Sequence, residues 1–147
     1  MEVIDKNSLY YVFLEIQRLH FYRSHKLLDE IGIYHGQPPM LFILNKKNGQ
    51  SQKELADMLN VKPSTITVML GRMEKAGLVE RRQDDEDQRI SRVYITEEGK
   101  KVCEKAREVM KNLEEECFGN LLAEEKVILR RLLLQIRDNL QEKNDGE

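Results

Sequence analysis

The chain has 147 residues, of which 34% are charged and 40% are hydrophobic, with only 8 Gly and 3 Pro. This length predicts a single domain with one core, and the composition excludes collagen-like and disordered proteins. The formal net charge is −2, but residues 46–92 hold ten basic and eight acidic residues, so the basic residues are concentrated in the middle of the chain.

The sequence contains no signal for export or membrane insertion. No apolar run approaches the roughly 18 residues that a membrane span needs, and the acidic N-terminus lacks the order of a signal peptide. The two cysteines are too few for a disulfide framework and fit a reducing compartment. We therefore expect a cytoplasmic protein that does not interact with membranes.

Two helices are predicted in the first third of the chain. Apolar residues recur at helical spacing over residues 5–31, which predicts a long helix that ends at Gly32. A second helix is predicted over residues 38–46, with prolines in its first turn and Gly49 beyond its end. Five consecutive apolar residues inside this helix indicate a central position.

Two shorter helices follow. Ser51 and Glu54 have the spacing of a capping box, which predicts a third helix that ends near Asn60. The fourth helix begins with Pro63, whose missing N–H costs nothing in a first turn, and ends before Gly77.

The remaining chain predicts a hairpin and two more helices. Residues 78–82 and 89–95 alternate like half-buried strands and are joined by a polar tip. Thr96 is the predicted N-cap of a long helix that continues to Cys117, and a last helix is predicted over residues 124–141 before a polar tail.

The fourth helix has one face suited to a DNA major groove. At 100° per residue its large apolar side chains fall on one side, and the other side has no acidic residue. A helix in the major groove needs small polar groups near base edges and a few long cations. The alternative is an ordinary solvated surface. The polar face comprises Ser64, Thr67, Val68, Gly71, Arg72 and Lys75.

The hairpin carries Arg81, Arg82, Arg89 and Arg92, a set suited to bind the DNA backbone with one arginine in the minor groove. We expect Arg89 to be the inserted side chain, because Asp87 is close enough to brace its guanidinium. The alternative is a salt-bridged surface hairpin, since the acidic residues 84–87 repel phosphate unless they are internally paired.

Three stretches, Ser51–Val61, Thr65–Val79 and Asp84–Gly99, resemble the MarR family of transcription regulators. The resemblance implies a mainly α fold with a small β-hairpin wing, a winged helix-turn-helix. It assigns residues 35–98 to DNA binding and residues 5–31 and 99–141 to dimerisation, within one domain over 1–147. Gln88 departs from the basic residue that the family often has beside the wing arginine.

The matching positions give the expected contacts with double-stranded DNA. Asp87 and Arg89 match the wing motif of the family, and five residues of the fourth helix match its recognition helix. Together with the other basic residues of this region, the predicted set is Ser64, Thr65, Thr67, Val68, Arg72, Lys75, Arg81, Arg82, Asp87, Arg89 and Arg92.

The resemblance also implies a homodimer, and the residues support this independently. The first helix and the last two carry more apolar surface than a wing domain can cover, so a second copy is the economical partner. Two recognition helices in successive major grooves predict a near-palindromic operator with half-sites about 10 base pairs apart.

Family members often hold a small aromatic or phenolic effector between the dimerisation helices and the wing domain. The residues expected near such a pocket are His20, Phe21, Arg23, Tyr34, His35 and Met40. For each of them, packing in the core is an alternative explanation. No cofactor is expected.

Histidines and cysteines suggest no further site. Some relatives bind zinc near the first helix, but no histidine follows His35 here, so we expect no metal. Cys103 and Cys117 are fourteen residues apart on one helix, about 21 Å, too far to pair. Both lie in the apolar stripe, which favours buried structural thiols, and peroxide-sensing relatives carry their reactive cysteine in the first helix.

We therefore expect a sequence-specific DNA-binding transcription regulator, a homodimeric repressor released by a ligand. The alternative is a winged helix that binds proteins and not specific DNA, which the acidic tip favours. An enzyme is not expected, because no Ser/His/acid set, glycine-rich phosphate loop or metal-spaced cluster is present. Steep weakening with salt would indicate DNA binding, and a flat response a protein partner.

Overall fold

The computed structural model describes residues 5–34 and 36–146. The chain divides into two compact units, residues 1–110 and 111–147, and each is described by itself. The single domain expected over 1–147 therefore stays a prediction. Within the described residues no helix combines the length and the apolar character that crossing a bilayer requires.

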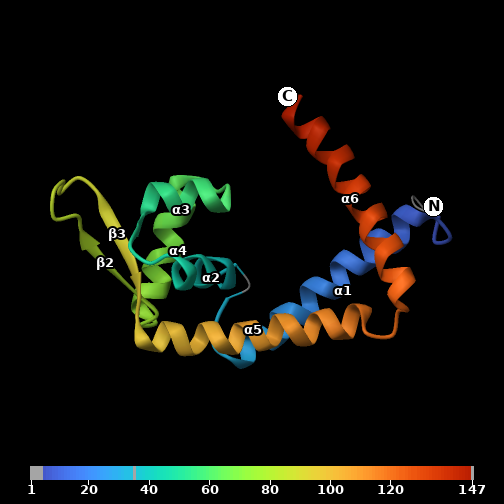
Figure 1. Cartoon of the computed structure of the whole chain (residues 1–147), viewed down its shortest axis with the longest axis horizontal. Helices are drawn as coiled ribbons and strands as arrows, with labels where there is room; N and C mark the ends of the chain where they lie inside the picture. Colours follow the sequence, from blue (N-terminus) through green and yellow to red (C-terminus); the bar gives the residue numbers. More distant parts are fainter. Residues whose placement is uncertain (1–4, 35, 147) are drawn as a thin grey trace. The chain divides into compact units, whose positions relative to one another are not determined.

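Six helices and three short strands make up the described chain (Figure 1). The mainly α architecture with a small antiparallel sheet confirms the predicted fold class. In chain order the elements are α1 (Leu9–Glu30), α2 (Pro38–Lys46), β1 (Gln50–Ser51), α3 (Gln52–Leu59), α4 (Pro63–Lys75), β2 (Val79–Gln83), β3 (Ser91–Ile95), α5 (Glu97–Phe118) and α6 (Ala123–Asp145).

Most helix boundaries follow the expected capping chemistry. The capping box at α3 is present, with the Glu54 N–H donating to Ser51 Oγ at 3.1 Å and the Ser51 N–H donating to Glu54 Oε2 at 3.4 Å. α1 begins four residues later than predicted, because the Ser8 hydroxyl caps it by accepting from the Tyr11 N–H. α6 continues to Asp145 through a tail that was expected to be irregular.

The sheet has three strands in the order β1-β3-β2, whereas the sequence predicts only the β2–β3 hairpin. β1 pairs antiparallel with β3, with Gln50 opposite Val93 and Ser51 opposite Arg92. Two residues are too few to show the alternation by which a strand is recognised in a sequence. This extra strand ties the base of the hairpin to the turn between α2 and α3.

The core of the first unit lies among α2, α3, α4 and the sheet. α2 is central, as predicted, since Met40, Leu41 and Leu44 have no exposed surface. Burial of side chains of this size is the main stabilising contribution to such a small unit. The other core side chains of this region include Leu55, Ile66, Leu70, Met73, Val79, Val93 and Ile95.

The start of α5 is fixed against the base of the wing. Thr96 caps the helix as predicted, accepting from the Gly99 N–H at 2.9 Å while its hydroxyl donates to the Gly77 carbonyl at 2.6 Å. A Cβ at Gly99 would collide with the carbonyl oxygen of Leu78, so only glycine allows this close approach. The hairpin therefore leaves the body of the unit at a fixed junction.

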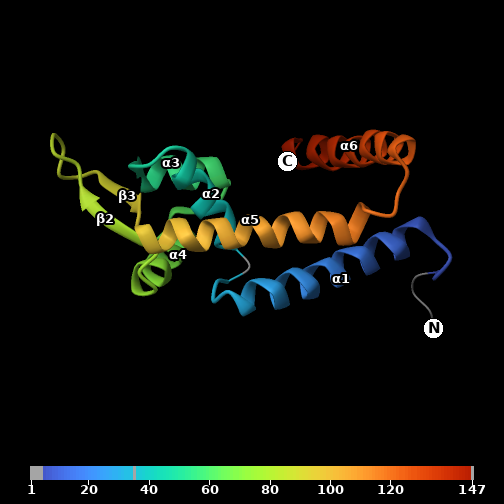
Figure 2. The same cartoon turned by 60° about the horizontal axis from the view of Figure 1, so that its bottom comes forward.

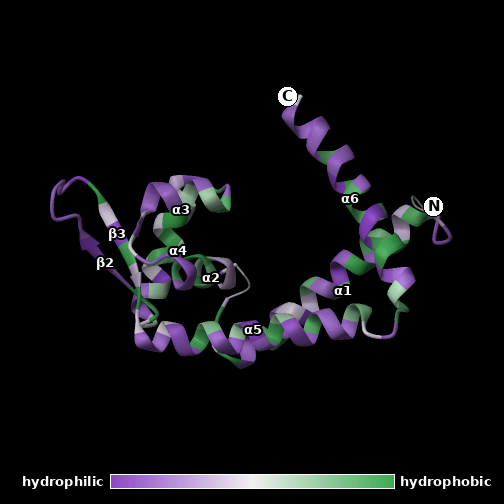
Figure 3. Cartoon of the chain, viewed as in Figure 1, coloured by the Kyte–Doolittle hydropathy of each residue, from purple (hydrophilic) through white to green (hydrophobic). Residues whose placement is uncertain are grey.

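The second unit consists of the end of α5 and the whole of α6. None of the 23 residues of α6, all of which lie in the described part of the chain, is buried. Hydrophobic residues nevertheless recur along this helix (Figure 3). Its exposed large apolar side chains are Val127, Ile128, Leu132, Leu133, Ile136 and Leu140.

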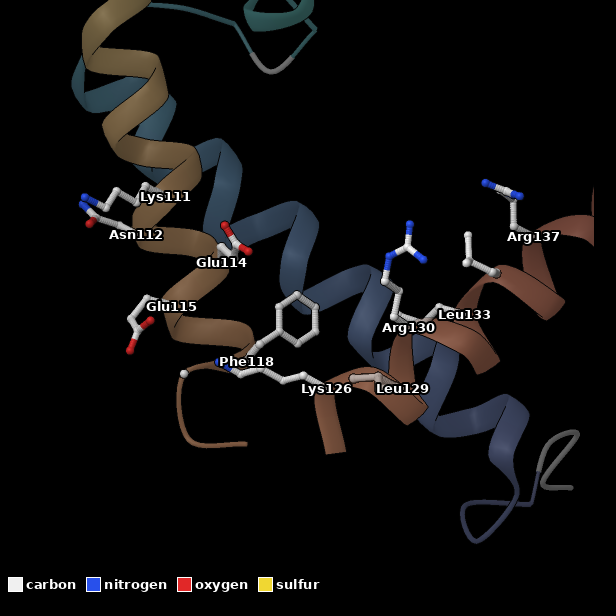
Figure 4. Close-up of a pocket in the computed structure, with 12 residues that line it drawn as sticks. Lys111, Asn112, Glu114, Glu115, Phe118, Lys126, Leu129, Arg130, Leu133 and Arg137 are labelled. Carbon is white, nitrogen blue, oxygen red and sulfur yellow. The ribbon is translucent and has the colours of Figure 1, made fainter. Parts of the chain in front are cut away.

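A groove of about 870 Å³ lies between the end of α5 and α6. Phe118 of α5 and Leu129 and Leu133 of α6 contribute apolar surface to it, and Lys126 and Arg130 add positive charge (Figure 4). This unit thus presents an open apolar surface of its own.

Candidate nucleic-acid interface

The orientation of α4 follows from its apolar side. Ile66, Leu70 and Met73 have no exposed surface, so burial fixes which side of the helix faces outward. The turn before α4 is equally defined, because Asn60 adopts a left-handed conformation and Pro63 occupies the first turn. The outward side contains every residue predicted to contact DNA from this helix, namely Ser64, Thr65, Thr67, Val68, Arg72 and Lys75, and all six are exposed.

Individual side chains on this outward face differ in what they can still bind. The Thr67 hydroxyl donates to the Pro63 carbonyl at 3.1 Å, so its proton is already used within the helix. Val68 is 57% exposed and presents a bare apolar surface. The Arg72 guanidinium carbon lies 5.5 Å from the centroid of the Tyr34 ring, within cation–π range.

The β2–β3 hairpin projects beyond the helices α2 to α4 in both views (Figures 1 and 2). Its register pairs Val79 with Ile95 and Gln83 with Ser91, which leaves residues 84–90 as the tip. The buried Val93 and Ile95 side chains anchor the base of this wing to the core.

Arg89 at the wing tip is braced as its spacing from Asp87 predicts. Its Nε donates to Asp87 Oδ1 at 3.0 Å and its Nη2 to Oδ2 at 3.0 Å, while the side chain is 90% exposed. The same hydrogen bonds hold the pKa of Asp87 below its usual range. A bidentate pair of this kind fixes the guanidinium direction while leaving it accessible.

The other three wing arginines also pair with carboxylates. Arg81 donates to Glu74 of α4 at 2.9 Å and Arg82 to Glu80 at 2.9 Å, while the Arg82 guanidinium carbon lies 4.6 Å from the centroid of the Tyr94 ring. The pairing lowers the pKa of Glu74 and raises that of Arg81. Both Arg81 and Arg92 are half-buried and therefore less available to a ligand than Arg82.

Arg92 pairs within the wing, although the sequence suggests a DNA contact for it. Its Nε donates to Asp84 Oδ1 at 2.6 Å and its Nη1 to the Gly49 carbonyl at 3.1 Å. This ion pair lowers the pKa of Asp84 and raises that of Arg92. The sequence left open whether the acidic residues of the tip are internally paired. Two of the four, Asp84 and Asp87, are paired with arginines of the same wing.

Several contributors to this interface were missed by sequence reasoning. Glu74 joins α4 to β2, Tyr94 supports Arg82, and the Gly49 carbonyl receives Arg92. Their partners are 7, 12 and 43 residues away in the chain, and no local pattern marks Tyr94 or Gly49. Only Glu74 carries a usable signal, since an acid on a basic helix needs a partner.

A pocket of about 410 Å³ borders the outward face of α4. It brings Tyr34 together with four predicted DNA contacts, Ser64, Thr65, Val68 and Arg72. Its volume is at the lower end of the range for small-molecule sites. Any molecule in this pocket would therefore cover part of the predicted DNA-binding surface.

The other expected effector residues do not join Tyr34. His20, Phe21 and Arg23 are exposed on α1 and line neither of the two pockets described here. Met40 is fully buried at the centre of α2, which favours the alternative of core packing for this residue. His35 lies outside the described residues.

The two cysteines differ in environment. Cys103 is buried, as expected, and burial raises the pKa of its thiol. The expectation of a buried thiol is wrong for Cys117, which is exposed four residues beyond Leu113, where the buried stripe of α5 ends. Among the described residues, no three His, Cys, Asp or Glu side chains form a cluster that could hold a metal.

Sequence comparisons and structural comparisons both find transcription regulators similar to this chain. A model of the MarR family matches residues 33–91. The uncharacterized HTH-type transcriptional regulator YwoH of Bacillus subtilis (strain 168) is 34% identical over 104 residues, covering 71% of this chain and 75% of that protein. The HTH-type transcriptional repressor IacR of Pseudomonas putida is 33% identical over 116 residues, covering 79% and 70%.

The solved structures extend this likeness over the flanking helices. A mutant MarR of Escherichia coli, crystallised in complex with operator DNA, superposes with a TM-score of 0.74 at 26% identity. The superposition covers 87% of this chain and 92% of that one.

Proposed function

Because the chain belongs to the MarR family of transcription regulators, which are not enzymes, we propose that it is a homodimeric repressor that a small ligand releases from a near-palindromic operator. The observation that carries the proposal is the exposed Arg89, braced by Asp87 beside a recognition helix whose single acidic residue, Glu74, is already paired with Arg81. That pair of surfaces suits simultaneous minor-groove and major-groove contact.

Replacement of Arg89 tests the DNA contact directly. Arg89→Ala should cost roughly 1 to 3 kcal/mol of specific binding in a fluorescence-anisotropy titration of a selected duplex. Arg107→Ala is the matched control, since Arg107 is also a surface arginine paired with a carboxylate, Glu104, but lies on α5. Equal affinities of the wild type and Arg89→Ala would remove Arg89 from the proposed interface.

The competing function, a protein-binding winged helix, rests on the acidic tip. Pairing of Asp84 and Asp87 with arginines weakens that reason, because these carboxylates already have cationic partners. Binding to DNA through several phosphates must weaken steeply as salt rises, and a flat salt response would favour the protein-binding alternative.

The proposed homodimer is supported by the second unit. A helix that carries six large exposed apolar side chains and buries none needs a partner surface, and a second copy supplies one symmetrically. We expect sedimentation equilibrium to give twice the chain mass of 17.3 kDa. Sites selected from a random-sequence duplex library should then show inverted half-sites about 10 base pairs apart.

Release by a ligand is proposed to act through the pocket at Tyr34 and Arg72. An aromatic anion fits there, because the Tyr34 ring offers a stacking surface and Arg72 a positive charge. Such a ligand and DNA would compete for Ser64, Thr65 and Val68. Binding of one would therefore exclude the other.

Benzoate and phenol are suitable probes, one anionic and one neutral. Benzoate should displace a labelled duplex from the wild type, and Tyr34→Ala should abolish this displacement. Phe21→Ala is the matched control, because Phe21 is an exposed aromatic residue of α1 outside the pocket. Loss of the response in Phe21→Ala alone would move the effector site to α1.

A further inference from the structure

The wing tip is held by a continuous chain of hydrogen bonds that begins in the body of the unit. Arg92 of β3 donates to the carbonyl of Gly49, in the turn before β1, and to Asp84 at the start of the tip. Asp84 Oδ2 in turn accepts from the backbone N–H groups of Glu86 at 3.2 Å and Asp87 at 3.0 Å.

The same chain of hydrogen bonds continues to the exposed arginine. Asp87 Oδ1 accepts from the Arg89 backbone N–H at 3.1 Å, and both carboxylate oxygens of Asp87 bind the Arg89 guanidinium. The two ion pairs differ in exposure, since the Arg92 and Asp84 side chains are 30% and 19% exposed, whereas that of Arg89 at the end of the path is 90% exposed. The inner pair is sheltered and the outer one is presented.

We propose that Arg92 and Asp84 are positioning residues that fix the wing tip and so preorganise Arg89 for the minor groove, without contacting DNA themselves. The inference rests on the proposed function, which makes Arg89 the inserted side chain. A side chain that is already held in its bound direction loses less conformational freedom on binding. In this arrangement Arg92 and Asp84 hold the tip in place and do not bind the DNA.

For a substitution of Asp84, a purely electrostatic role and a positioning role predict opposite changes in DNA affinity. Removing a carboxylate near DNA reduces repulsion, so Asp84→Asn and Asp84→Ala should both bind more tightly if the residue acts only through its charge. If Asp84 positions the tip, both variants bind more weakly. Asp84→Ala is then the weaker of the two, because asparagine keeps an oxygen that can accept from the Glu86 and Asp87 N–H groups.

Arg92 gives a second distinction between positioning and contact. If Arg92 binds a phosphate, Arg92→Gln reduces the slope of log affinity against log salt by about one, whether or not Arg89 is present. If it positions Arg89, the slope changes little and the loss disappears in a chain that already carries Arg89→Ala.

The experiment is a double-mutant cycle on a duplex that the wild-type protein selects from a random library. We expect Asp84→Ala and Arg92→Gln to weaken binding about five- to tenfold alone, and less than twofold in the Arg89→Ala background. Asp85→Asn is the matched control, an exposed acid of the same tip that should bind as tightly as the wild type or more tightly. Thermal unfolding checks that each variant folds.

A measurement on the free protein separates this inference from the proposed function. The ¹⁵N heteronuclear NOE of the Arg89 amide should indicate a rigid tip in the wild type and Asp85→Asn, and a mobile one in Asp84→Ala and Arg92→Gln. A tip that stays rigid in both variants, or a binding loss that persists fully without Arg89, would overturn the positioning role. Equal binding by the wild type and Arg89→Ala would instead overturn the proposed contact, while the NOE still decides the positioning.

Discussion

The winged-helix region and α6 treat their apolar residues in opposite ways. Residues 38–95 bury most of their large apolar side chains, with Met40, Leu70 and Val93 fully buried, whereas none of the apolar side chains of α6 is buried. The first region can therefore be understood within one chain. The apolar side chains of α6 have no partner surface within their own unit, and this is the reason for proposing a dimer.

The largest expected effect comes from charging the exposed stripe of α6. Leu132→Asp should dissociate the proposed dimer and weaken operator binding by about 100-fold or more, because two linked heads bind with far higher avidity than one. The near-UV circular dichroism of the winged-helix region should be retained. Gln135→Asp, at a polar position of the same helix, is the control and should remain dimeric. A Leu132→Asp variant that also remains dimeric would contradict the proposal that the apolar stripe of α6 forms the dimer interface.

A core substitution should act on folding instead. Leu70→Ala removes a fully buried side chain of α4 and is expected to lower the free energy of unfolding by about 2 to 5 kcal/mol in urea titrations. Met58→Ala, on an exposed residue of α3, should change it by less than about 0.5 kcal/mol. Similar losses of unfolding free energy in both variants would mean that burial does not determine how much each side chain contributes to stability.

A smaller loss is expected from the capping box of α3. Ser51→Ala removes the oxygen that accepts from the Glu54 N–H and should cost about 1 kcal/mol of unfolding free energy. Ser64→Ala is the comparison, because the Ser64 side chain faces outward on α4. Ser51→Ala should therefore lose more stability than Ser64→Ala. In a DNA-binding titration Ser64→Ala should lose more affinity than Ser51→Ala, since only Ser64 is a predicted contact.

The smallest effect is electrostatic and confined to the wing. The ion pair with Arg92 depresses the pKa of Asp84, so its stabilising contribution is present above the ordinary aspartate pKa and is lost as the pH falls through the depressed value. Arg92→Gln should raise the midpoint of the Asp84 carboxyl in an NMR titration. An unmoved midpoint would show that the pair does not form in solution.

Much of the fold was readable from local patterns. The α3 capping box, the Thr96 cap and the Asp87–Arg89 brace each involve residues two or three apart, so the sequence contains them whole. The two-residue β1 and the Arg92 contact with Gly49 depend on pairings over more than 40 residues, which no local period encodes. Arg81, Arg82 and Arg92 therefore looked equivalent in the sequence, although two of them are half-buried in ion pairs.

The contrast between the two thiols has a practical side. With Cys103 enclosed and Cys117 exposed near the end of α5, a maleimide dye should modify the native chain at one position. A fluorophore placed there without mutagenesis would report on the neighbourhood of α6 rather than on the wing. Its labelling rate, followed across a dilution series, would show how much of that neighbourhood a second copy shields.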